Sequence, residues 1–273
     1  MEQFIHYFDT IPSSHRGLIL VGGIALFWVI ENAFPFFKFQ YNKINHAKIN
    51  IFFTITSIAV NFCLAFLLLS VSQLTTEYKF GLLHLLPKMN FWMFTIIGLL
   101  LLDLIGAYLA HLTEHKIKFL WRFHLVHHTD KWVDTTSANR HHPGESVIRF
   151  LFTTVGVLII GAPMWLVFLY QSMSVVFSQF NHANIVLPSK VDQILSYFFV
   201  TPDMHKIHHH YKMPYTDTNF GNIFSIWDRL FGTFSTLNRN DIVFGLDTHL
   251  HENEHNRIKN LLKIPFQKVR APK

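Results

Sequence analysis

Charged residues are scarce in this chain, and their scarcity excludes an ordinary soluble domain. Asp, Glu, Lys and Arg make up 15% of the 273 residues, whereas hydrophobic residues make up 50% and the mean hydropathy is +0.26. Soluble globular domains carry about 25% charged residues. The composition therefore indicates an integral membrane protein, and the length suits a single membrane domain over residues 1–273.

Cysteine is almost absent as well. Cys63 is the only one, and it stands inside an apolar run. The chain can therefore form no internal disulfide, no thiolate metal site and no Cys-x-x-Cys redox motif. We expect Cys63 to be a small buried hydrophobic residue.

The net charge of +6 does not indicate a nucleic-acid partner, and we expect none. The basic residues lie in loops and in the C-terminal segment, as is typical of the cytoplasmic side of a membrane protein. The residues before the first apolar run include Glu2 and Asp9. They lack the positive start and the small-residue cleavage site of a signal peptide, so we expect none.

Long apolar runs predict an all-α integral membrane protein with about four to five transmembrane helices. About 20 apolar residues span a bilayer as a helix. One long run is interrupted by Gly161, Ala162 and Pro163, which predicts a helical hairpin because proline breaks a helix. A last run is too short to span and predicts an interfacial or re-entrant segment. The spans are expected at 17–34, with Glu31 at the interface, 51–71, 91–112 and the hairpin 146–185, and the short segment at 191–200.

The distribution of lysine and arginine predicts the orientation of these spans. Segments 38–48, 116–149 and the basic tail 235–273 are rich in them, whereas segment 75–88 is poorer. A start outside, followed by alternation, places every basic segment on the cytoplasmic side. We therefore expect the C-terminus and a helical cap that carries the histidines to be cytoplasmic.

Histidine is abundant and patterned. Twelve of the 19 histidines fall between residues 111 and 210, in five short blocks. Histidines three or four positions apart leave one face of a helix together, and imidazole is the commonest metal-ligating side chain. The blocks read HLTEH (His111, His115), HLVHH (His124, His127, His128), NRHHP (His141, His142), FNHAN (His182) and HKIHHH (His205, His208, His209, His210).

These blocks supply more ligands than one metal ion takes, so the pattern indicates a multi-metal centre. The predicted topology brings the blocks to one membrane face. A closed structural zinc site uses four ligands, and imidazole also suits iron, copper and nickel. Two irons that activate O₂ fit a lipid-embedded, aromatic-rich chain better. Glu114, inside the first block, is expected to face solvent.

Two further residues are candidates for supporting roles. Asp103 lies within an apolar span, where a carboxylate indicates a functional site. We expect it to accept the outer N–H of a ligand histidine; a helix–helix hydrogen bond is the alternative. The sequence His142-Pro143-Gly144 is similar to a haem-ligand turn of cytochrome b5, but three residues do not make that domain. Electrons are therefore expected from a separate protein.

The whole pattern from Asp103 to Phe234 resembles the fatty acid hydroxylase/sterol desaturase superfamily of membrane di-iron enzymes. The histidine blocks occur in the family's order, with the loop Asp134–Arg140 before His142-Pro143. Asn219-Phe220-Gly221 and the run Trp227–Thr233 follow the last block. The combination is highly specific, although no single block is.

The resemblance implies a membrane enzyme that uses O₂ and two electrons from an external donor to hydroxylate or desaturate a lipid. It implies a cap holding two iron ions, which zinc could replace, and a catalytic region at 103–234. By the resemblance, His142 would support catalysis, as Asp103 is already expected to from its place in an apolar span, and His210 lies outside the site. The loop 134–143 is similar to a bacterial group, which implies the bacterial inner membrane. The implied metal ligands are His111, His115, His124, His127, His128, His182, His205, His208 and His209.

Other functions stay open at this point. Within the superfamily, the alternatives are ether-lipid cleavage of the alkylglycerol monooxygenase type and carotenoid hydroxylation. A metal transporter would place ionisable ligands near the bilayer midplane, where only Asp103 is expected. A haem membrane protein would need single histidines facing each other from different spans, whereas here they occur in doublets at span ends.

Overall fold

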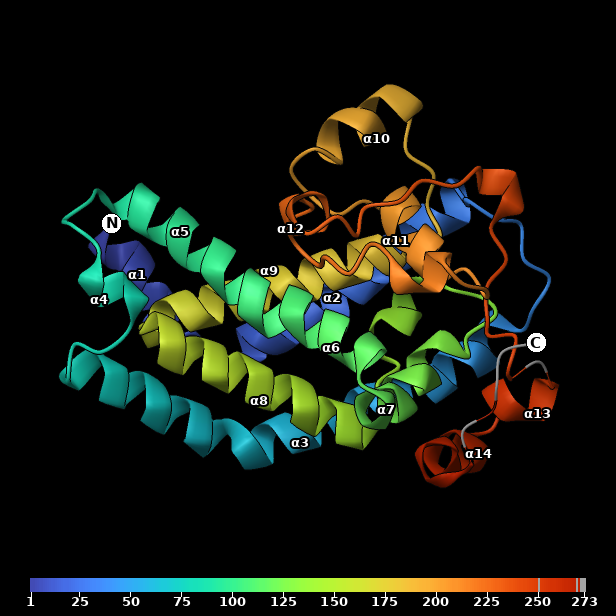
Figure 1. The fold of residues 1–273 in the computed structure, drawn as a ribbon, viewed down its shortest axis with the longest axis horizontal. Helices are drawn as coiled ribbons and strands as arrows, with labels where there is room; N and C mark the ends of the chain where they lie inside the picture. The colour runs from blue at the N-terminus through green and yellow to red at the C-terminus, as the bar shows by residue number, and fades with distance from the viewer. Residues whose placement is uncertain (250, 269, 271–273) are drawn as a thin grey trace.

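The computed structural model describes residues 1–249, 251–268 and 270, and this part of the chain is helical without a β-strand. Long helices run side by side through one part of the molecule, and short helices and loops form a cap at the other end (Figure 1). The predicted all-α fold is confirmed. Lys273, part of the predicted basic tail, lies outside the described residues.

Four segments are long and apolar enough to cross a membrane, as the hydropathy predicted. The first is α2, and the second is α3 with the short helix that follows it. In the third, α5 continues through a π-helical turn into α6. The segments are Ser13–Ala33 (α2), Lys43–Leu85 (α3, Lys43–Glu77, and α4, Leu82–Leu85), Phe91–Lys116 (α5, Phe91–Asp103; π-turn, Leu104–Leu109; α6, Ala110–Lys116) and Pro143–Ile160 (α8).

The predicted hairpin is confirmed. It consists of α8 and α9 (Met164–His182), and the chain reverses at the three residues named from the sequence. Gly161 has φ +74°, and a Cβ there would lie 2.2 Å from the carbonyl oxygen of Phe80. Only glycine tolerates this conformation and this close approach together.

Apolar side chains divide between a core and an outer surface. Leu102, Val157 and Leu166 are buried in the bundle, whereas Phe62 and Phe66 of α3 are 82% and 81% exposed. Exposed phenylalanines on a spanning helix face lipid. The expectation that Cys63 is buried is wrong, because it lies on this same exposed part of α3.

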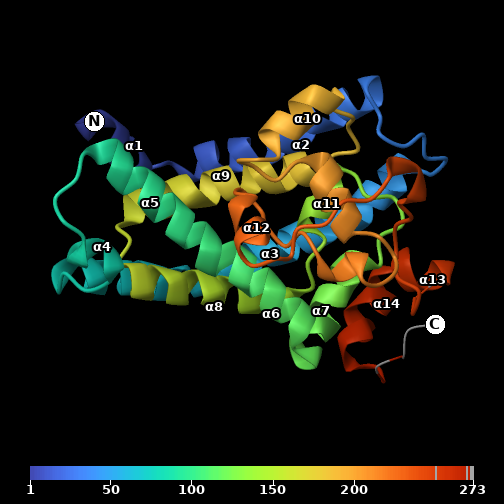
Figure 2. The ribbon, with the colours of Figure 1, turned by 45° about the horizontal axis from the view of Figure 1, so that its top comes forward.

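The cap is built from short elements around the ends of α3, α6, α8 and α9 (Figures 1 and 2). Its helices are too short to be stable alone, so packing and side-chain hydrogen bonds hold them. They are α7 (Lys118–His128), α10 (Ser189–Leu195), α11 (Pro202–His208), α12 (Ile226–Leu230), α13 (Glu252–His255) and α14 (Ile258–Lys263), with 3₁₀ turns at Thr135–Asn139, Tyr215–Asp217, Arg239–Asp241 and Ile264–Phe266. At the opposite end of the bundle lie α1 (Glu2–Asp9) and α4.

Two expectations about the cap are refined by the structure. Glu31 lies at the cap end of α2 but is buried, with an ion pair of 2.7 Å to Lys43 and a hydrogen bond from the amide of Asn184. The described part of the predicted tail is not free, because Leu261 and Ile264 pack against Phe53 and α7. Both contacts fasten the cap to the spanning helices.

Candidate metal centre

Four helix ends bring the nine predicted ligand histidines together. His111 and His115 leave one face of α6, one turn apart, and α7 follows after a single extended residue, Ile117. His182 is the last residue of α9. His124, His127 and His128 are on α7. The last three are His205 and His208 of α11 and His209 at its C-cap. Local helical spacing thus orients each block, and packing of the four ends makes the blocks converge.

The nine histidines form two groups. In the five-histidine group, one ring nitrogen from each residue lies within 4.8 Å of every other. Its shortest contacts run from His124 Nε2 to His111 Nε2, 3.0 Å, and to His128 Nε2, 3.1 Å. The group consists of His111, His115, His124, His128 and His208.

The four-histidine group is centred on His182. Its Nε2 atom lies 3.1 Å from Nε2 of His127, 3.1 Å from that of His205 and 3.2 Å from that of His209. These four residues are again within 4.8 Å of one another through single nitrogens. The groups are neighbours, because the rings of His128 and His209 stack at 4.7 Å.

Hydrogen bonds alone do not account for this convergence. A neutral imidazole nitrogen carries either one hydrogen or one lone pair, so His182 Nε2 cannot satisfy three other Nε2 atoms. A metal ion bound by imidazole nitrogens at about 2.1 Å places two of them at right angles about 3.0 Å apart. The observed contacts of 3.0–3.2 Å therefore fit the ligand spacing around an ion in each group.

The protonation state of the rings also suits metal binding. Burial lowers the pKa of the cap histidines well below that of a free imidazole, and neighbouring histidines lower it further. The rings are therefore neutral near pH 7, which is the form that binds a metal ion. The cap histidines with this lowered pKa are His124, His127, His128, His205, His208 and His209.

Backbone carbonyls fix two rings of the five-histidine group. His111 Nδ1 donates to the carbonyl of Phe220 at 2.8 Å, and His208 Nδ1 donates to that of Thr218 at 2.7 Å. A hydrogen bond at Nδ1 sets the tautomer and leaves Nε2 as the ligand atom. The phenyl ring of Phe220, itself fully buried, covers the same histidines.

Carboxylates fix two more rings of that group. His124 Nδ1 lies 2.7 Å from Glu145 Oε1, and His115 Nδ1 lies 3.2 Å from Asp217 Oδ1. Although burial opposes it, the bonds to His115 and Lys116 lower the pKa of Asp217 to about 2. A charged carboxylate behind an imidazole makes the ring a more basic ligand.

The four-histidine group has a different surrounding. His182 Nδ1 donates to the carbonyl of Ser178 at 2.7 Å, one turn earlier in α9. The ring of His141 stacks on that of His127 at 4.9 Å, with an angle of 18° between the planes. The sequence assigned no role to His141, although it follows the Asp134–Arg140 loop directly.

The sequence did not predict an ion-pair network that lies behind the histidines. Glu114 was expected in solvent, but it is fully buried and pairs with Arg149 at 2.7 Å. Glu145 Oε1 accepts hydrogen bonds from His124, from His141 and, at 3.0 Å, from Arg149 Nε. Because a guanidinium occupies this position, His124, His141 and Glu145 form a charge network rather than a third metal site. The i,i+4 spacing of Glu145 and Arg149 is the signal that the sequence offered.

His142 does not support the centre as expected. Its Nδ1 accepts the amide of Gly144 at 3.0 Å and so caps α8. Its ring faces Phe123 and Phe266, away from the two groups. A histidine directly before Pro143 is well placed for an N-cap, because proline favours the first helical turn.

Asp103 also has other partners than those expected. Its carboxylate accepts the amides of Ile223 and Phe224, at 3.3 and 3.1 Å, and the indole N–H of Trp227 at 3.2 Å. No ligand histidine is among its hydrogen-bond partners in the described residues. The alternative, a helix–helix hydrogen bond, is observed, because Trp227 of α12 donates to Asp103 at the end of α5; the other two donors lie in the loop before α12.

A second buried polar cluster holds the loop that joins the histidine blocks. His46 of α3 lies between Asp130, 2.9 Å away, and Asp134, 3.1 Å away. Burial would raise the pKa of Asp130, but His46 and Arg140 hold it well below its usual value. Nothing in the spacing of the sequence relates His46 to this loop, since more than 80 residues separate them. The cluster fixes the chain directly after His128.

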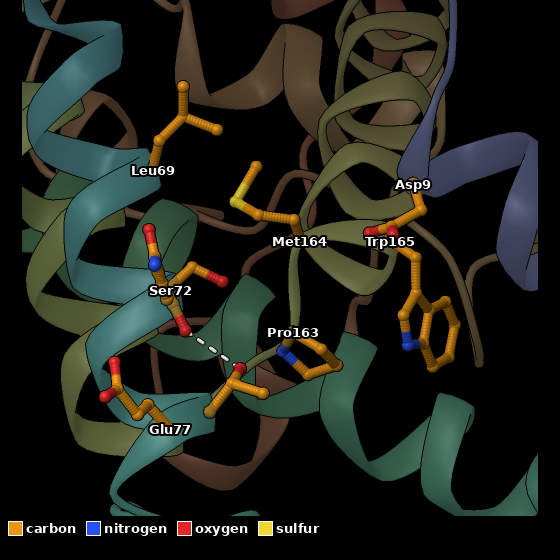
Figure 3. A pocket seen from close by; sticks show the side chains of 9 residues that line it. Asp9, Leu69, Ser72, Glu77, Pro163, Met164 and Trp165 are labelled. Atoms are coloured by element: carbon orange, nitrogen blue, oxygen red, sulfur yellow. Dashed lines mark hydrogen bonds between the residues drawn. The ribbon is translucent and has the colours of Figure 1, made fainter.

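The described cavities lie elsewhere. A hollow of about 750 Å³ opens between α3 and the hairpin turn, lined by Ser72, Glu77, Met164 and Asp9 among others (Figure 3). It is at the end of the bundle where α1 and α4 lie, opposite to the cap (Figure 1). His210 lies outside both groups, as expected, with its Nδ1 accepting the amide of Val243.

Comparison with known protein families agrees with this centre. The family model "Fatty acid hydroxylase" matches residues 95–233, just over half of the chain. That range contains all nine histidines of the two groups. The chain belongs to the fatty acid hydroxylase family.

Individual relatives carry names of lipid-modifying oxygenases. An ornithine lipid hydroxylase of Rhizobium tropici is 27% identical over 51% of this chain and 41% of the relative. An alkylglycerol monooxygenase of Caenorhabditis elegans is 30% identical over 55% of this chain and 29% of the relative. A cholesterol 25-hydroxylase-like protein of Danio rerio is 28% identical, covering 45% and 48%.

The chain thus spans less than half the length of each of these relatives. No solved structure gives a significant match. Together with the four apolar spans, the family establishes an integral membrane protein, and the activity has to be inferred from the site.

Proposed function

We propose that the protein is a membrane-bound di-iron oxygenase that inserts oxygen into, or desaturates, a lipid. The observation that carries the proposal is the pair of histidine groups, whose nitrogens already have the spacing of metal ligands. One ion would be held by His111, His115, His124, His128 and His208, and the other by His127, His182, His205 and His209. Thiolates would be oxidised readily in such a site, and imidazoles are more resistant.

Bound iron would supply the activation of O₂, and the protein supplies position and the exclusion of water. Hydroxylation consumes R–H, O₂, two electrons and two protons, and it forms R–OH and H₂O. Desaturation consumes the same O₂, electrons and protons, and it forms the alkene and two H₂O. The electrons come from a separate electron-transfer protein. Phe220 excludes water from the five-histidine group, and Glu145 and Asp217 hold its rings in place.

A lipid is the substrate class that the named relatives support, since they are an ornithine lipid hydroxylase, an alkylglycerol monooxygenase and a cholesterol 25-hydroxylase-like protein. Ether-lipid cleavage is the second candidate, because the alkylglycerol monooxygenase is 30% identical to this chain. Metal transport is disfavoured. Both groups lie at the cap end of the helices, whereas a transporter binds ions near the midplane.

The orientation is part of the proposal. Basic residues on the cap side, among them Lys48, Lys118 and Lys263, are exposed in the structure. The excess of lysine and arginine near the ends of spans marks the cytoplasmic side. We therefore place the metal centre and the C-terminus in the cytoplasm, and the protein in a bacterial inner membrane.

The test is metal analysis of the protein purified in mild detergent from iron-supplemented cells. About two irons per chain are expected, and the double variant His127→Ala, His208→Ala should lose them. His6→Ala is the control, because His6 is exposed at the opposite end of the bundle. Lipids from cells grown under ¹⁸O₂ should then gain one ¹⁸O atom or lose two hydrogens. Absence of metal from both proteins would refute the proposal.

A further inference from the structure

Seven exposed apolar residues form a shelf on the side of the cap. The turn after α10 presents Tyr197 and Phe198, 60% and 63% exposed, and α12 presents Leu230, 66% exposed. A soluble surface seldom leaves so large an apolar patch uncovered. The shelf consists of Val191, Ile194, Tyr197, Phe198, Ile226, Leu230 and Phe231.

The shelf lies beside the spanning helices rather than beyond them. In Figure 1, α10 projects sideways from the region where the bundle meets the cap, and α12 lies between α10 and the bundle. Figure 2 shows α10 beside α2 near the same region. Trp227 of α12 belongs to a buried cluster with Tyr108 and Phe220, and Leu100, Leu104 and Leu112 of the third span pack against that cluster. The exposed side of α12 is therefore continuous with the lipid-facing side of that span.

Asp103 gives the depth of α12. It is the thirteenth residue of a 26-residue span, and a helix rises 1.5 Å per residue, so it lies about 18 Å from the far end. The hydrocarbon core of a bilayer is about 30 Å thick. Asp103 therefore lies within the hydrocarbon core. Because the indole of Trp227 donates to Asp103, the start of α12 lies within that core as well.

Polar groups at the edge of the shelf also indicate that it lies at the membrane surface. The guanidinium of Arg229 lies 4.1 Å from the ring centre of Phe234 and 5.5 Å from that of Tyr197. Lys190, at the start of α10, is exposed. Tyrosine, arginine and lysine collect where a protein surface crosses from acyl chains to headgroups, since their stems are apolar and their tips polar.

We propose that the shelf lies in the bilayer, at the boundary between acyl chains and headgroups, and that lipid is its partner. This surface is tied to the candidate metal centre. Asp228 of α12 accepts the amides of Phe220 and Gly221 at 2.7 and 2.9 Å, and the carbonyl of Phe220 orients His111. Resting on the proposed function, the shelf holds the five-histidine group at a set height above the lipid that is oxidised.

Depth measurement with nitroxide labels tests the shelf. Cys63→Ser removes the only native thiol, and single cysteines then replace Ile194, Phe198 or Leu230 in the full chain. After reconstitution into phosphatidylcholine and phosphatidylglycerol vesicles, labels there should relax with O₂ and be protected from a water-soluble nickel chelate. A label at Phe66, on the lipid-facing part of α3, is the apolar reference, and one at exposed Glu252 of α13 is the aqueous reference.

Shelf labels that resemble the label at Glu252 would overturn the proposal. So would short label-to-label distances between chains, since these would show that a second copy covers the shelf. If a cysteine variant fails to fold, carbene footprinting of the unmodified protein in the same vesicles measures whether lipid shields Tyr197 and Phe198. None of these readouts needs iron or turnover, so a metal-free protein with a lipid-facing shelf would refute the proposed function alone.

Discussion

The two histidine groups lie side by side in the cap, yet they are built differently. The five-histidine group has carboxylates behind two of its rings, Glu145 behind His124 and Asp217 behind His115. Within the described residues, the outer hydrogen bond of the four-histidine group runs from His182 to the carbonyl of Ser178. Nδ1 of His127, His205 and His209 has no protein partner there.

This difference has a direct consequence for metal affinity. A carboxylate fixes the ring and raises its basicity, and loss of such a partner typically costs a factor of about 10 to 100 in affinity. With an additional ligand and two carboxylates, the five-histidine group should hold its ion more firmly. The ion in the four-histidine group should exchange first.

The largest effect is expected from removing the central histidine of each group. His182→Ala removes the ring that contacts all three others of its group, and His124→Ala removes the ring at 3.0–3.1 Å from His111 and His128. Each variant should retain about one of two irons by elemental analysis. His210→Ala is the matched control, since it is buried but outside both groups. Loss of both irons in each single variant would show one indivisible site.

The carboxylates come next. Glu145→Gln and Asp217→Asn should each speed the loss of one iron to a chelator, by about tenfold or more. The iron of the four-histidine group should leave at its former rate. Glu254→Gln is the control, because Glu254 pairs with Arg270 away from the centre. Equal acceleration of both irons would contradict the assignment of these carboxylates to one group.

Acid tests a property that the two groups share. The pKa values of His127, His205 and His209, and of His124, His128 and His208, are lowered by burial. In the unfolded chain the same rings titrate near 6.5, so below that pH the unfolded state binds more protons. Metal-free protein should therefore be most stable above pH 6.5 and lose stability as the pH falls. Thermal unfolding in detergent between pH 8 and 5 measures this, and an unchanged melting temperature would contradict it.

The smallest effect is expected from Asp103→Asn. In the variant an NH₂ group replaces one carboxylate oxygen, so the side chain can no longer accept all three bonds from Ile223, Phe224 and Trp227. A buried donor left without an acceptor costs about 1 to 3 kcal/mol. The protein should still insert and bind two irons, but with a lower melting temperature. Only the five-histidine group should exchange its iron somewhat faster, through the loop that carries Phe220. Loss of iron from the four-histidine group would mean that Asp103 acts otherwise.

The spans and the ligand candidates could be predicted because both follow from local spacing. Apolar length marked the spans, and Gly161 with Pro163 marked the hairpin turn. The division of the ligands has a simple basis that becomes clear in the structure. Residues i and i+4 lie within 40° of each other around a helix, whereas neighbours lie 100° apart. His124 and His128 therefore enter one group and His127 the other, and α11 divides its histidines in the same way.

The remaining contacts could not be predicted because their partners are distant along the chain. Asp103 meets residues 223–227, and His46 meets Asp130 and Asp134. No periodicity connects such positions. Glu114 was expected in solvent because it is charged, but Arg149 of another helix accompanies it into the core. His142, to which the family resemblance assigned a supporting role, caps a helix instead.

The helix α11 has a consequence for the order of events during synthesis. His208 completes the five-histidine group, and His205 and His209 complete the four-histidine group. All three emerge from the ribosome within five residues of one another, long after His111. Neither ion can therefore find its full ligand set until nearly all of the membrane-spanning chain has been made. On the proposed function, iron loading would therefore be a late step, and α11 would complete both ligand sets at nearly the same time.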